Sequence, residues 1–298
     1  MTGLHRFAIL LAACTLLLVA AGGLVTSNDA GLSVPDWPLS YGKLMPPMEG
    51  GILYEHGHRM IATLTGVLTI VLAVWLWRVD DRTWMKRLGL VAVAAVIAQG
   101  VLGGLTVIYL LPPAISVSHA CLAQLFFATT VAIAVFTSAS WRRGPHIVSD
   151  AGAPSLRTLA MAAPIFVLMQ LALGAAARHK ALGVVYHIGA ASLVTGVILW
   201  VCVRVLRHYS EHPPLLRSAL ALLSIAFSQV FLGIAAYMSR IATADAVQPM
   251  PVMIAFTVLH VAVGALTMAA SVVLAIQVFR NVRPQEARMA PGRMAVAS

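Results

Sequence analysis

The sequence predicts an all-α integral membrane protein, with eight transmembrane helices arranged as two pseudo-twofold-related four-helix bundles. Sixty per cent of its 298 residues are hydrophobic and only 10% are charged, whereas roughly a quarter of the residues in a soluble domain are charged. Eight apolar stretches are long enough to cross a hydrocarbon layer, which takes about 20 residues per helix. Helices are favoured over an open sheet because each helix satisfies its own backbone hydrogen bonds in lipid.

The eight stretches follow one another with mostly short connections, so neighbouring helices are expected to run antiparallel. They cover residues 7–26, 59–77, 88–111, 115–139, 157–177, 182–203, 216–238 and 252–279. The first stretch is too long for the apolar region of a typical secretory signal and is interpreted as a helix. The longest connection, residues 27–57, is rich in Gly and Pro and is predicted to be an ordered outer loop that covers something.

The positive charge of the chain is distributed unevenly between the two sides of the predicted bundles. The net charge is +10. With the N-terminus inside, fifteen Lys and Arg residues fall in inner segments and five in outer ones, namely Lys43, Arg59, Arg178, Lys180 and Arg240. Because cytoplasmic loops carry such an excess, both termini are expected in the cytoplasm of a cell inner (plasma) membrane. The expected partner of the basic surface is the lipid bilayer and not nucleic acid.

A short pattern of Gln, Leu and Gly recurs in three of the predicted helices. It comprises Gln99-x-x-Leu102-Gly103, Gln170-x-x-Leu173-Gly174 and Gln229-x-x-Leu232-Gly233. The first helix lacks the Gln but has Gly22 and Gly23 at a similar place. After each of these sites comes a loop and then a helix that opens with a histidine, so the repeating unit is a helical hairpin used four times.

Two such hairpins make one four-helix bundle, which gives the predicted division of the chain. Residues 1–140 form the N-terminal bundle, which includes the outer loop 27–57, and residues 156–280 form the C-terminal bundle. Residues 141–155 are expected to be a cytoplasmic linker, and residues 281–298 a flexible cytoplasmic tail. Four helices per half preserve orientation, so a twofold axis along the membrane normal would relate the bundles.

Four histidines stand at the starts of every second predicted helix: His58, His119, His187 and His260. Haem iron takes axial imidazoles from facing helices of a bundle, so His58 with His119 and His187 with His260 are candidate ligand pairs. Burial and the positive end of a helix both favour the neutral imidazole that a ligand requires. A single intramembrane histidine more often bonds to a neighbouring helix, but four in register favour ligation. A proton relay usually recruits membrane acids, and none lies mid-helix here.

One acid breaks the symmetry of the four histidine sites. Glu55 lies three residues before His58, and no Asp or Glu precedes the other three histidines at that spacing. A carboxylate beside a haem could relay protons or stabilise a cation during oxidation. Glu55 is equally consistent with a charge near a helix start that pairs with Arg59, so both interpretations stay open. The remaining inner histidines are expected to be solvated: His5, His146, His208 and His212.

The first outer loop and the residues after it resemble the haem A synthase family. The likeness runs through residues 31–42, Met45-Pro46-Pro47 and Tyr54-Glu55-His56-Gly57-His58-Arg59, and more weakly over all eight helices. Pro-Asp-Trp-Pro followed by Glu-x-x-His-Arg is not a general membrane pattern. Some bacterial members carry a Cys pair in this loop, whereas this chain has none and places Ser40 near the expected position.

The resemblance implies an oxidoreductase that acts on a CH3 group of haem O. Such an enzyme oxidises the C8 methyl to a formyl group by two successive oxidations, giving haem A for cytochrome c oxidase. By position, Glu55 would be the catalytic carboxylate, while His58 and His119 would bind the iron of the substrate haem O. His187 and His260 would bind the iron of a haem b cofactor. The implied partners are a haem O synthase and the cytochrome c oxidase assembly machinery, and a homo-oligomer stays open.

Two other functions are compatible with paired histidines. A di-haem b-type membrane cytochrome for quinone-linked electron transfer explains the four ligands but neither Glu55 nor the elaborate first loop. A haem carrier without enzymatic activity predicts one labile haem and no formyl product. The pigment that the protein holds or makes would distinguish all three functions.

Overall fold

The computed structural model describes residues 2–284 of the chain, and within them eight helices are long and apolar enough to cross a membrane. These are α1 (Gly3–Ser27), α2 (Gly50–Val79), α3 (Thr83–Ile108), α4 (Pro113–Thr137), α6 (Leu156–Arg178), α7 (Val184–His208), α8 (Pro213–Ala242) and α9 (Pro251–Asn281). A short helix, α5 (Ala139–Arg142), and two short strands, β1 (Val148–Asp150) and β2 (Val282–Pro284), lie outside the spans. The predicted all-α membrane fold is confirmed.

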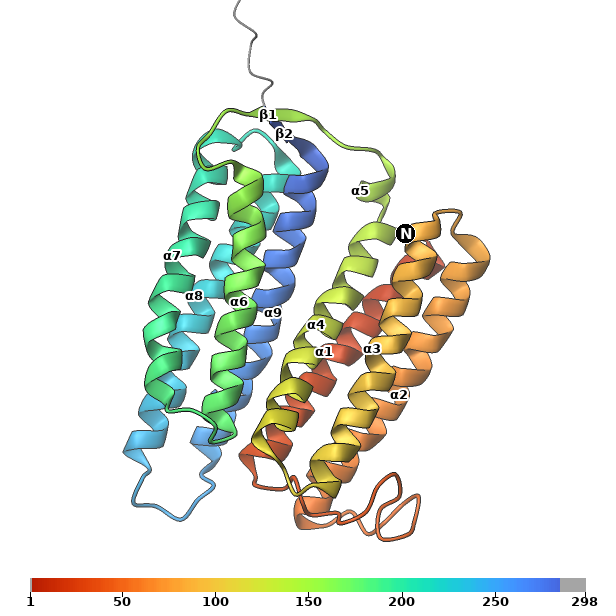
Figure 1. Ribbon diagram of the computed structural model, residues 1–298, viewed down its shortest axis with the longest axis vertical. Helices are drawn as coiled ribbons and strands as arrows, with labels where there is room; N and C mark the ends of the chain where they lie inside the picture. Colours follow the sequence, from red (N-terminus) through yellow and green to blue (C-terminus); the bar gives the residue numbers. More distant parts are fainter. Residues whose placement is uncertain (1, 285–298) are drawn as a thin grey trace, which may run out of the picture.

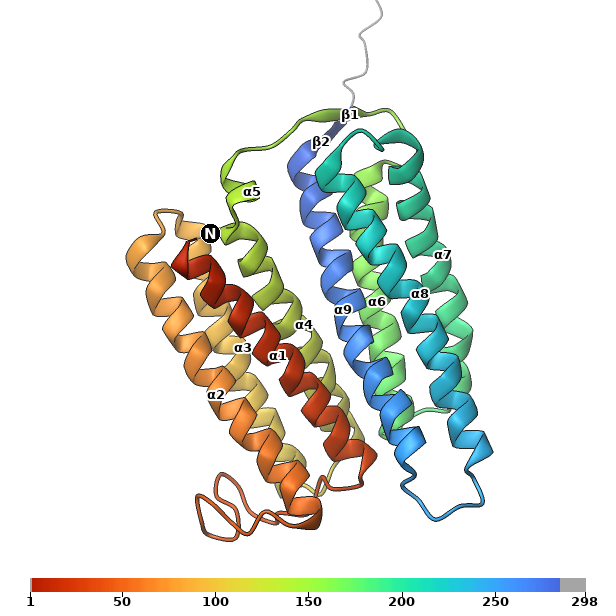
Figure 2. The ribbon, with the colours of Figure 1, turned by 180° about the vertical axis from the view of Figure 1, so that it is seen from behind.

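The spans form two four-helix bundles that lie side by side, α1–α4 and α6–α9 (Figures 1 and 2). Helices α1 and α4 of the first bundle lie against α9 of the second, and α4 also contacts α6. At this junction Val19 and Phe127 pack against Ala265 and Ala269 of α9. Small side chains allow the close approach of helices that packing in lipid requires. The predicted arrangement as two bundles is therefore confirmed.

Each bundle has its apolar core toward one end. We call this the terminal end, because the N-terminus and the last turn of α9 lie there, and we call the opposite end the histidine end (Figure 1). The first core includes Leu4, Leu11, Leu72, Leu76, Met85 and Ile133, and the second includes Leu156, Val201, Val205, Leu215, Leu222 and Leu274. Both cores thus hold the helices together near the terminal end.

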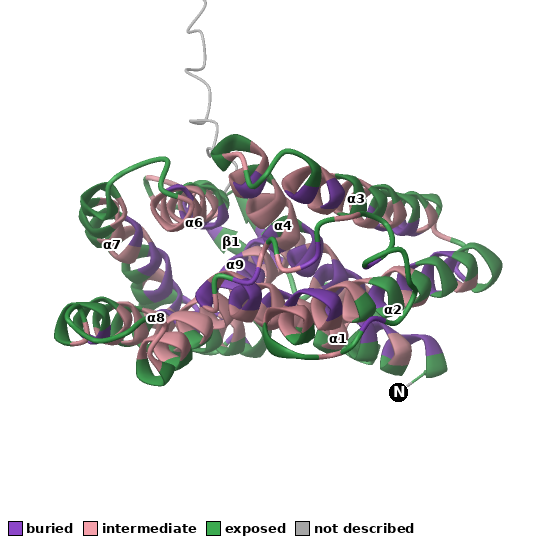
Figure 3. Ribbon diagram, turned by 90° about the horizontal axis from the view of Figure 1, so that it is seen from below, coloured by how far each residue is buried: buried purple, intermediate pink, exposed green. Residues whose placement is uncertain are grey.

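The outer faces of the bundles are apolar and exposed. Seen from the histidine end, buried segments gather where α1, α4 and α9 meet, and the peripheral faces of α7 and α8 are exposed (Figure 3). Large apolar side chains such as Leu17, Phe227 and Phe231 are more than half exposed. A soluble protein rarely exposes such continuous apolar surface, so these faces are suited to lipid.

Helix α2 begins nine residues earlier than the hydropathy pattern predicts, at Gly50 rather than at residue 59. Glu55 and His58 therefore both lie inside the helix, less than one turn apart, and the first loop shortens to residues 28–49. Polar residues lower the hydropathy of this first stretch of α2, so a search for apolar runs overlooks it. The helix nevertheless forms because the loop supplies partners for those polar side chains.

The four histidines do not all stand at helix starts. His187 lies in the first turn of α7, but His119 lies beyond the first turn of α4, and His58 and His260 lie more than two turns inside α2 and α9. The effect of a helix dipole falls off within the first turn. The expectation that all four sites benefit from a helix N-terminus is therefore wrong, and it applies only to His187.

The linker between the bundles is tied to the end of the chain. Strand β1 in the linker pairs in parallel with β2 after α9, with Val148 opposite Val282. Neither strand was predicted, and residues 282–284 belong to the segment expected to be a flexible tail. The rest of that predicted tail, residues 285–298, lies outside the described residues.

Asp150 fixes the linker to the second bundle. Its carboxylate accepts hydrogen bonds from the Leu156 amide at 2.5 Å and the Tyr209 hydroxyl at 2.9 Å, and Arg204 lies 3.4 Å away. Burial opposes ionisation of Asp150, but the backbone amides of Leu156 and Gly152, Tyr209 and Arg204 together hold its pKa below the usual value. Burial and the neighbouring carboxylate raise the pKa of Tyr209 to about 12.

Two histidines that were expected to be solvated are buried. His5 on α1 places Nδ1 3.2 Å from the Thr137 hydroxyl on α4. His212 caps α8, because its Nδ1 accepts the Leu215 amide at 3.3 Å while its Nε2 lies 2.8 Å from the His146 carbonyl. These two side chains are structural contacts at the terminal end.

Candidate functional site

Each of the four histidines faces a glycine on the preceding helix. His58 faces Gly22, His119 faces Gly103, His187 faces Gly174, and His260 faces Gly233. A methyl group added at these glycines would lie 3.1, 3.3, 2.9 and 2.8 Å, respectively, from the Cε1 atom of the imidazole. These distances are shorter than ordinary van der Waals contacts. A Cβ at Gly174 or Gly233 would force the ring to move, and a Cβ at Gly22 or Gly103 would make a tight contact with it.

The glycine also uncovers a backbone carbonyl for the imidazole. A helical side chain covers the turn that precedes its own Cα, so the absence of a side chain at Gly174 exposes the carbonyl of Gln170, four residues earlier. His187 Nδ1 lies 3.1 Å from that carbonyl oxygen. The equivalent carbonyls, of Leu18, Gln99 and Gln229, lie near His58, His119 and His260 respectively. Leu18 supplies the same backbone group to His58, although α1 lacks the repeated glutamine.

The Nδ1 atoms of the other three histidines are buried without a hydrogen-bond partner among the described residues: His58, His119 and His260. Buried polar atoms in native proteins are nearly always paired, and an orphan calls for an explanation. A small rotation of each ring would let Nδ1–H donate a hydrogen bond to the nearby carbonyl. This bond would favour the tautomer that carries its proton on Nδ1. The Nε2 lone pair would then be free for a metal, which is the arrangement usual for histidine ligands.

Two of the recurring glutamines hold the histidine backbone in place. The side-chain amide of Gln99 donates to the His119 carbonyl at 3.0 Å, and that of Gln170 donates to the His187 carbonyl at 2.8 Å. Gln229 differs, because its Nε2 lies 3.4 Å from His260 Nε2. The repeated Gln and Gly residues thus contact the histidines of the following helix. The sequence showed that this pattern precedes each of three histidines, but it did not show the contacts.

The rings of His187 and His260 come together at the histidine end of the second bundle. Their centroids are 6.1 Å apart and their planes are nearly perpendicular, at 87°. Two imidazoles bound to opposite faces of one metal ion, with metal–nitrogen distances of about 2 Å, also place their centroids about 6 Å apart. These two residues therefore fit the axial positions of one haem iron. In the first bundle, His58 and His119 lie within electrostatic range of each other.

The apolar cores stop short of the histidines. In the second bundle the core begins at Val194 on α7, ends at Ala226 on α8 and begins at Met268 on α9, about two helical turns from the histidine level. The core of the first bundle likewise contains Leu72 and Phe126 but no residue near His58 or His119. Within the described residues, neither apolar core therefore extends to the level of the histidine rings.

Glu55 is buried and already paired. Only 4% of its surface is exposed. Its Oε1 lies 2.5 Å from an Arg59 guanidinium nitrogen, and its Oε2 accepts the backbone amide of Val34 at 2.8 Å. The ion pair expected as one interpretation of Glu55 is thus present, beside His58 on the same helix.

Arg59 holds the first loop against α2. It donates to the carbonyls of Asp36 at 2.8 Å and Leu39 at 2.9 Å. The loop is further fixed by Ser40, whose hydroxyl lies 2.8 Å from His56 Nδ1. Hydrogen bonds therefore hold this loop, which contains no cysteine.

The loop also reaches across to α3. Trp37 packs so closely on Gly104 that an added Cβ would lie 2.6 Å from the indole. Within the loop, the Asp36 carboxylate accepts the amides of Tyr41 at 2.6 Å and Gly42 at 2.8 Å. The backbone hydrogen bonds from Gly42 and Tyr41 lower the pKa of Asp36, although desolvation acts in the opposite direction. The Pro-Asp-Trp-Pro block is therefore a folded cover over the ends of α2 and α3.

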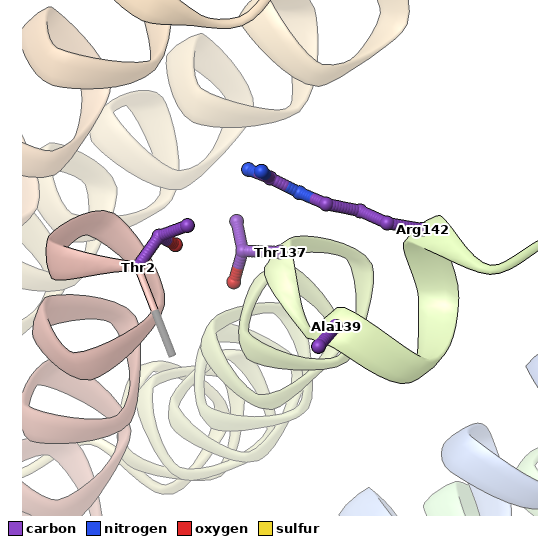
Figure 4. A pocket seen from close by; sticks show the side chains of 4 residues that line it. All are labelled: Thr2, Thr137, Ala139 and Arg142. Carbon is purple, nitrogen blue, oxygen red and sulfur yellow. The ribbon is translucent and has the colours of Figure 1, made fainter.

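A cavity of about 330 Å³ at the terminal end is lined by Thr2, Thr137, Ala139 and Arg142 (Figure 4). Figure 4 shows the Arg142 side chain extending from α5 above Thr137. Because the histidines lie at the opposite end of the helices, this cavity is not part of the candidate site.

The chain matches the COX15-CtaA family model, described as cytochrome oxidase assembly protein, over residues 5–53 and 50–190. This match includes the first bundle with Glu55, His58 and His119, and also His187 in the second bundle. It ends before α8 and α9, so His260 lies outside it.

Curated relatives carry the name heme A synthase. The chain is 33% identical over 173 residues to the protein of Symbiobacterium thermophilum, with 56% of each chain covered. It is 29% identical over 174 residues to that of an Exiguobacterium species, covering 57% of this chain and 56% of the relative. For Shouchella clausii the identity is 32% over 134 residues, covering 43% and 44%. The matched part thus spans about half the length of these relatives. The family model covers more than half of this chain, and the protein belongs to the COX15-CtaA family of cytochrome oxidase assembly proteins.

Proposed function

We propose that the protein is a haem A synthase of the cell inner membrane, with its terminal end in the cytoplasm. The observation that carries this proposal is the pair of rings of His187 and His260, 6.1 Å apart, in a frame of glycine and carbonyl that the first bundle repeats. Membership of the family and the names of the relatives support the same activity. The excess of positive charge at the terminal end supports the orientation.

The proposed reaction converts the C8 methyl of haem O to the formyl group of haem A. Two successive two-electron oxidations would give an aldehyde hydrate, which loses water. Written with water as the oxygen source, the net change is CH3 + H2O → CHO + 4 H+ + 4 e−, so the reaction requires an external acceptor of four electrons. His58 and His119 would hold the substrate haem O, and His187 and His260 would hold a haem b. Bound haem supplies the redox chemistry that side chains lack. The chain itself orients the macrocycles through four imidazoles, and loop 28–49 limits the access of water from the histidine end.

Glu55 is the proposed catalytic carboxylate. Arg59 and the Val34 amide fix its two oxygens at the side of the first histidine site. A carboxylate held in this way can stabilise positive charge that develops at the methyl carbon and can accept the proton that leaves. Its ion pair with Arg59 is compatible with this role, because a carboxylate retains further lone pairs when each oxygen accepts one hydrogen bond.

Co-expression with a haem O synthase, in a host without haem A, tests the activity. Extraction and mass analysis of the pigments should reveal haem A. Haem B alone would instead support the di-haem b-type cytochrome.

Glu55→Gln should lower the haem A yield by about a hundredfold or more, the usual contribution of a positioned acid or base, without loss of bound haem. Glu49→Gln is the matched control, because Glu49 is exposed and its side chain makes no capping hydrogen bond to α2. An unchanged haem A yield in Glu55→Gln would rule out the assigned role.

His58→Ala should abolish haem A formation and leave the visible spectrum of haem in the second bundle intact. The reason is that His58 belongs to the first bundle, whereas His187 and His260 form a separate pair. Loss of the second-bundle spectrum with retention of product would contradict the assignment of ligands to bundles.

A further inference from the structure

Arg178, the last residue of α6, joins the two bundles at the histidine end. Its Nη2 donates to the Gly23 carbonyl at 2.8 Å and to the Ser27 hydroxyl at 2.7 Å, both on α1. Figure 1 shows the ends of α6 and α1 close to each other at this point. Two of the contacts of this guanidinium thus cross from the second bundle to the first.

This guanidinium lies between the two histidine sites. Gly23 directly follows Gly22, the residue that contacts the His58 ring. The charge of Arg178 lies within electrostatic range of His260, and the next residue, His179, lies within range of His119. Burial and the charge of Arg178 lower the pKa of His179, which favours a neutral His179 at pH 7. The positive charge between the two histidine sites is therefore that of Arg178.

No carboxylate in residues 2–284 lies within ion-pair distance of Arg178, although Asp29 lies within electrostatic range of it. The three ion pairs found there involve Glu55, Asp80 and Asp150, and Arg178 is in none of them. Both of its hydrogen bonds use one nitrogen, Nη2, and go to uncharged oxygens. A half-buried cation at the edge of a membrane is costly unless an anion pairs with it, and a guanidinium N–H makes a strong, charge-assisted hydrogen bond to a carboxylate.

We propose that Arg178 binds a carboxylate of the tetrapyrrole held by His187 and His260. The inference rests on the proposed haem in the second bundle, because the propionate groups are the anions that a haem brings into the site. The bonds to Gly23 and Ser27 keep Nη2 on α1, so that Nη1 and Nε are the donors left for a single hydrogen bond to the ligand.

The test measures haem loss from the purified full-length protein loaded with haem B. Transfer to excess apomyoglobin is followed by absorbance and requires no turnover. Arg178→Gln should release the second-bundle haem about tenfold faster, because it removes a charge-assisted hydrogen bond. Arg178→Lys keeps the charge but not the positions of the Nη1 and Nε donors, and its rate of haem release should fall between those of Arg178→Gln and the wild type.

Two controls separate binding of the carboxylate from joining of the bundles. Ser27→Ala weakens the tie to α1 and keeps the cation, and Lys43→Gln removes an exposed cation from the same end of the molecule. Both should release haem at the wild-type rate. Equal acceleration in Ser27→Ala and Arg178→Gln, or a wild-type rate in Arg178→Gln, would overturn the proposal.

The outcome is distinguishable from that of the proposed function. Faster release from Arg178→Gln in a protein that makes no haem A would refute synthase activity and retain the carboxylate site. Haem A formation by the wild type, with unchanged release from Arg178→Gln, would refute the carboxylate site alone. A wild-type protein that holds no haem would overturn both.

Discussion

At the scale of single residues, the histidine sites depend on side chains that are absent. In each site a glycine leaves space for an imidazole and uncovers a helix carbonyl for its Nδ1. The four histidines could be selected from the sequence because polar residues are rare in apolar helices. The function of the glycines could not, since small residues in membrane helices usually serve close helix packing.

Gly233→Ala should displace His260, because the new methyl would lie 2.8 Å from the ring. We expect about a tenfold loss of haem affinity in the second bundle, as is typical when a residue that orients a ligand is changed. The haem-to-protein ratio and the visible spectrum measure this. Gly196→Ala on α7 is the matched control, because nothing lies within 4 Å of an added Cβ there. Equal haem content in the two variants would contradict the steric role.

At the scale of elements, the apolar parts of the helices could be predicted and their polar ends could not. All eight spans follow from hydropathy, but the first turns of α2 carry Glu55, His56 and His58 and lie outside the apolar run. Those turns are helical because Arg59, Ser40 and the Val34 amide satisfy the side chains. Such partners come from a loop whose path no local pattern specifies. The sequence therefore predicted candidate site residues but not the contacts that hold their side chains.

Arg59→Gln should loosen the first loop, because Arg59 holds the carbonyls of Asp36 and Leu39 and the carboxylate of Glu55. Lys43 lies in this loop and offers a trypsin site. We expect cleavage after Lys43 to become at least severalfold faster, since proteolysis follows local opening of the chain. Mass analysis of the fragments measures the rate. Arg143→Gln, an exposed change in the linker at the terminal end, should leave the rate unchanged, and an unchanged rate in Arg59→Gln would show that the loop is held by other contacts.

At the scale of the whole molecule, the two bundles are joined in different ways at their two ends. At the terminal end the linker pairs with β2 and is fixed by Asp150. At the histidine end Arg178 crosses from α6 to α1, beyond the apolar core of either bundle. Two bundles could be predicted from the repeated hairpin. Their joints could not, because those contacts occur once and have no counterpart in the repeat.

The joint at the terminal end should make stability depend on pH through Asp150. The folded protein holds the pKa of Asp150 below its ordinary value of 3.8, so ionised Asp150 stabilises the fold above about pH 4. This contribution is lost as the pH falls through the lowered pKa, since the folded state must then accept a proton it disfavours. Asp150→Asn should therefore reduce the Tm at pH 7 by roughly 5 °C, given hydrogen bonds to a charged group and a domain of this size.

Thermal unfolding in detergent between pH 3 and pH 7 measures the effect. The difference in Tm between the wild type and Asp150→Asn should be constant above about pH 4 and should narrow below it. Asp81→Asn is the control, because Asp81 is exposed in the turn between α2 and α3. A difference that is independent of pH down to pH 3 would mean that the geometry of the Asp150 side chain, and not its charge, holds the linker to the second bundle.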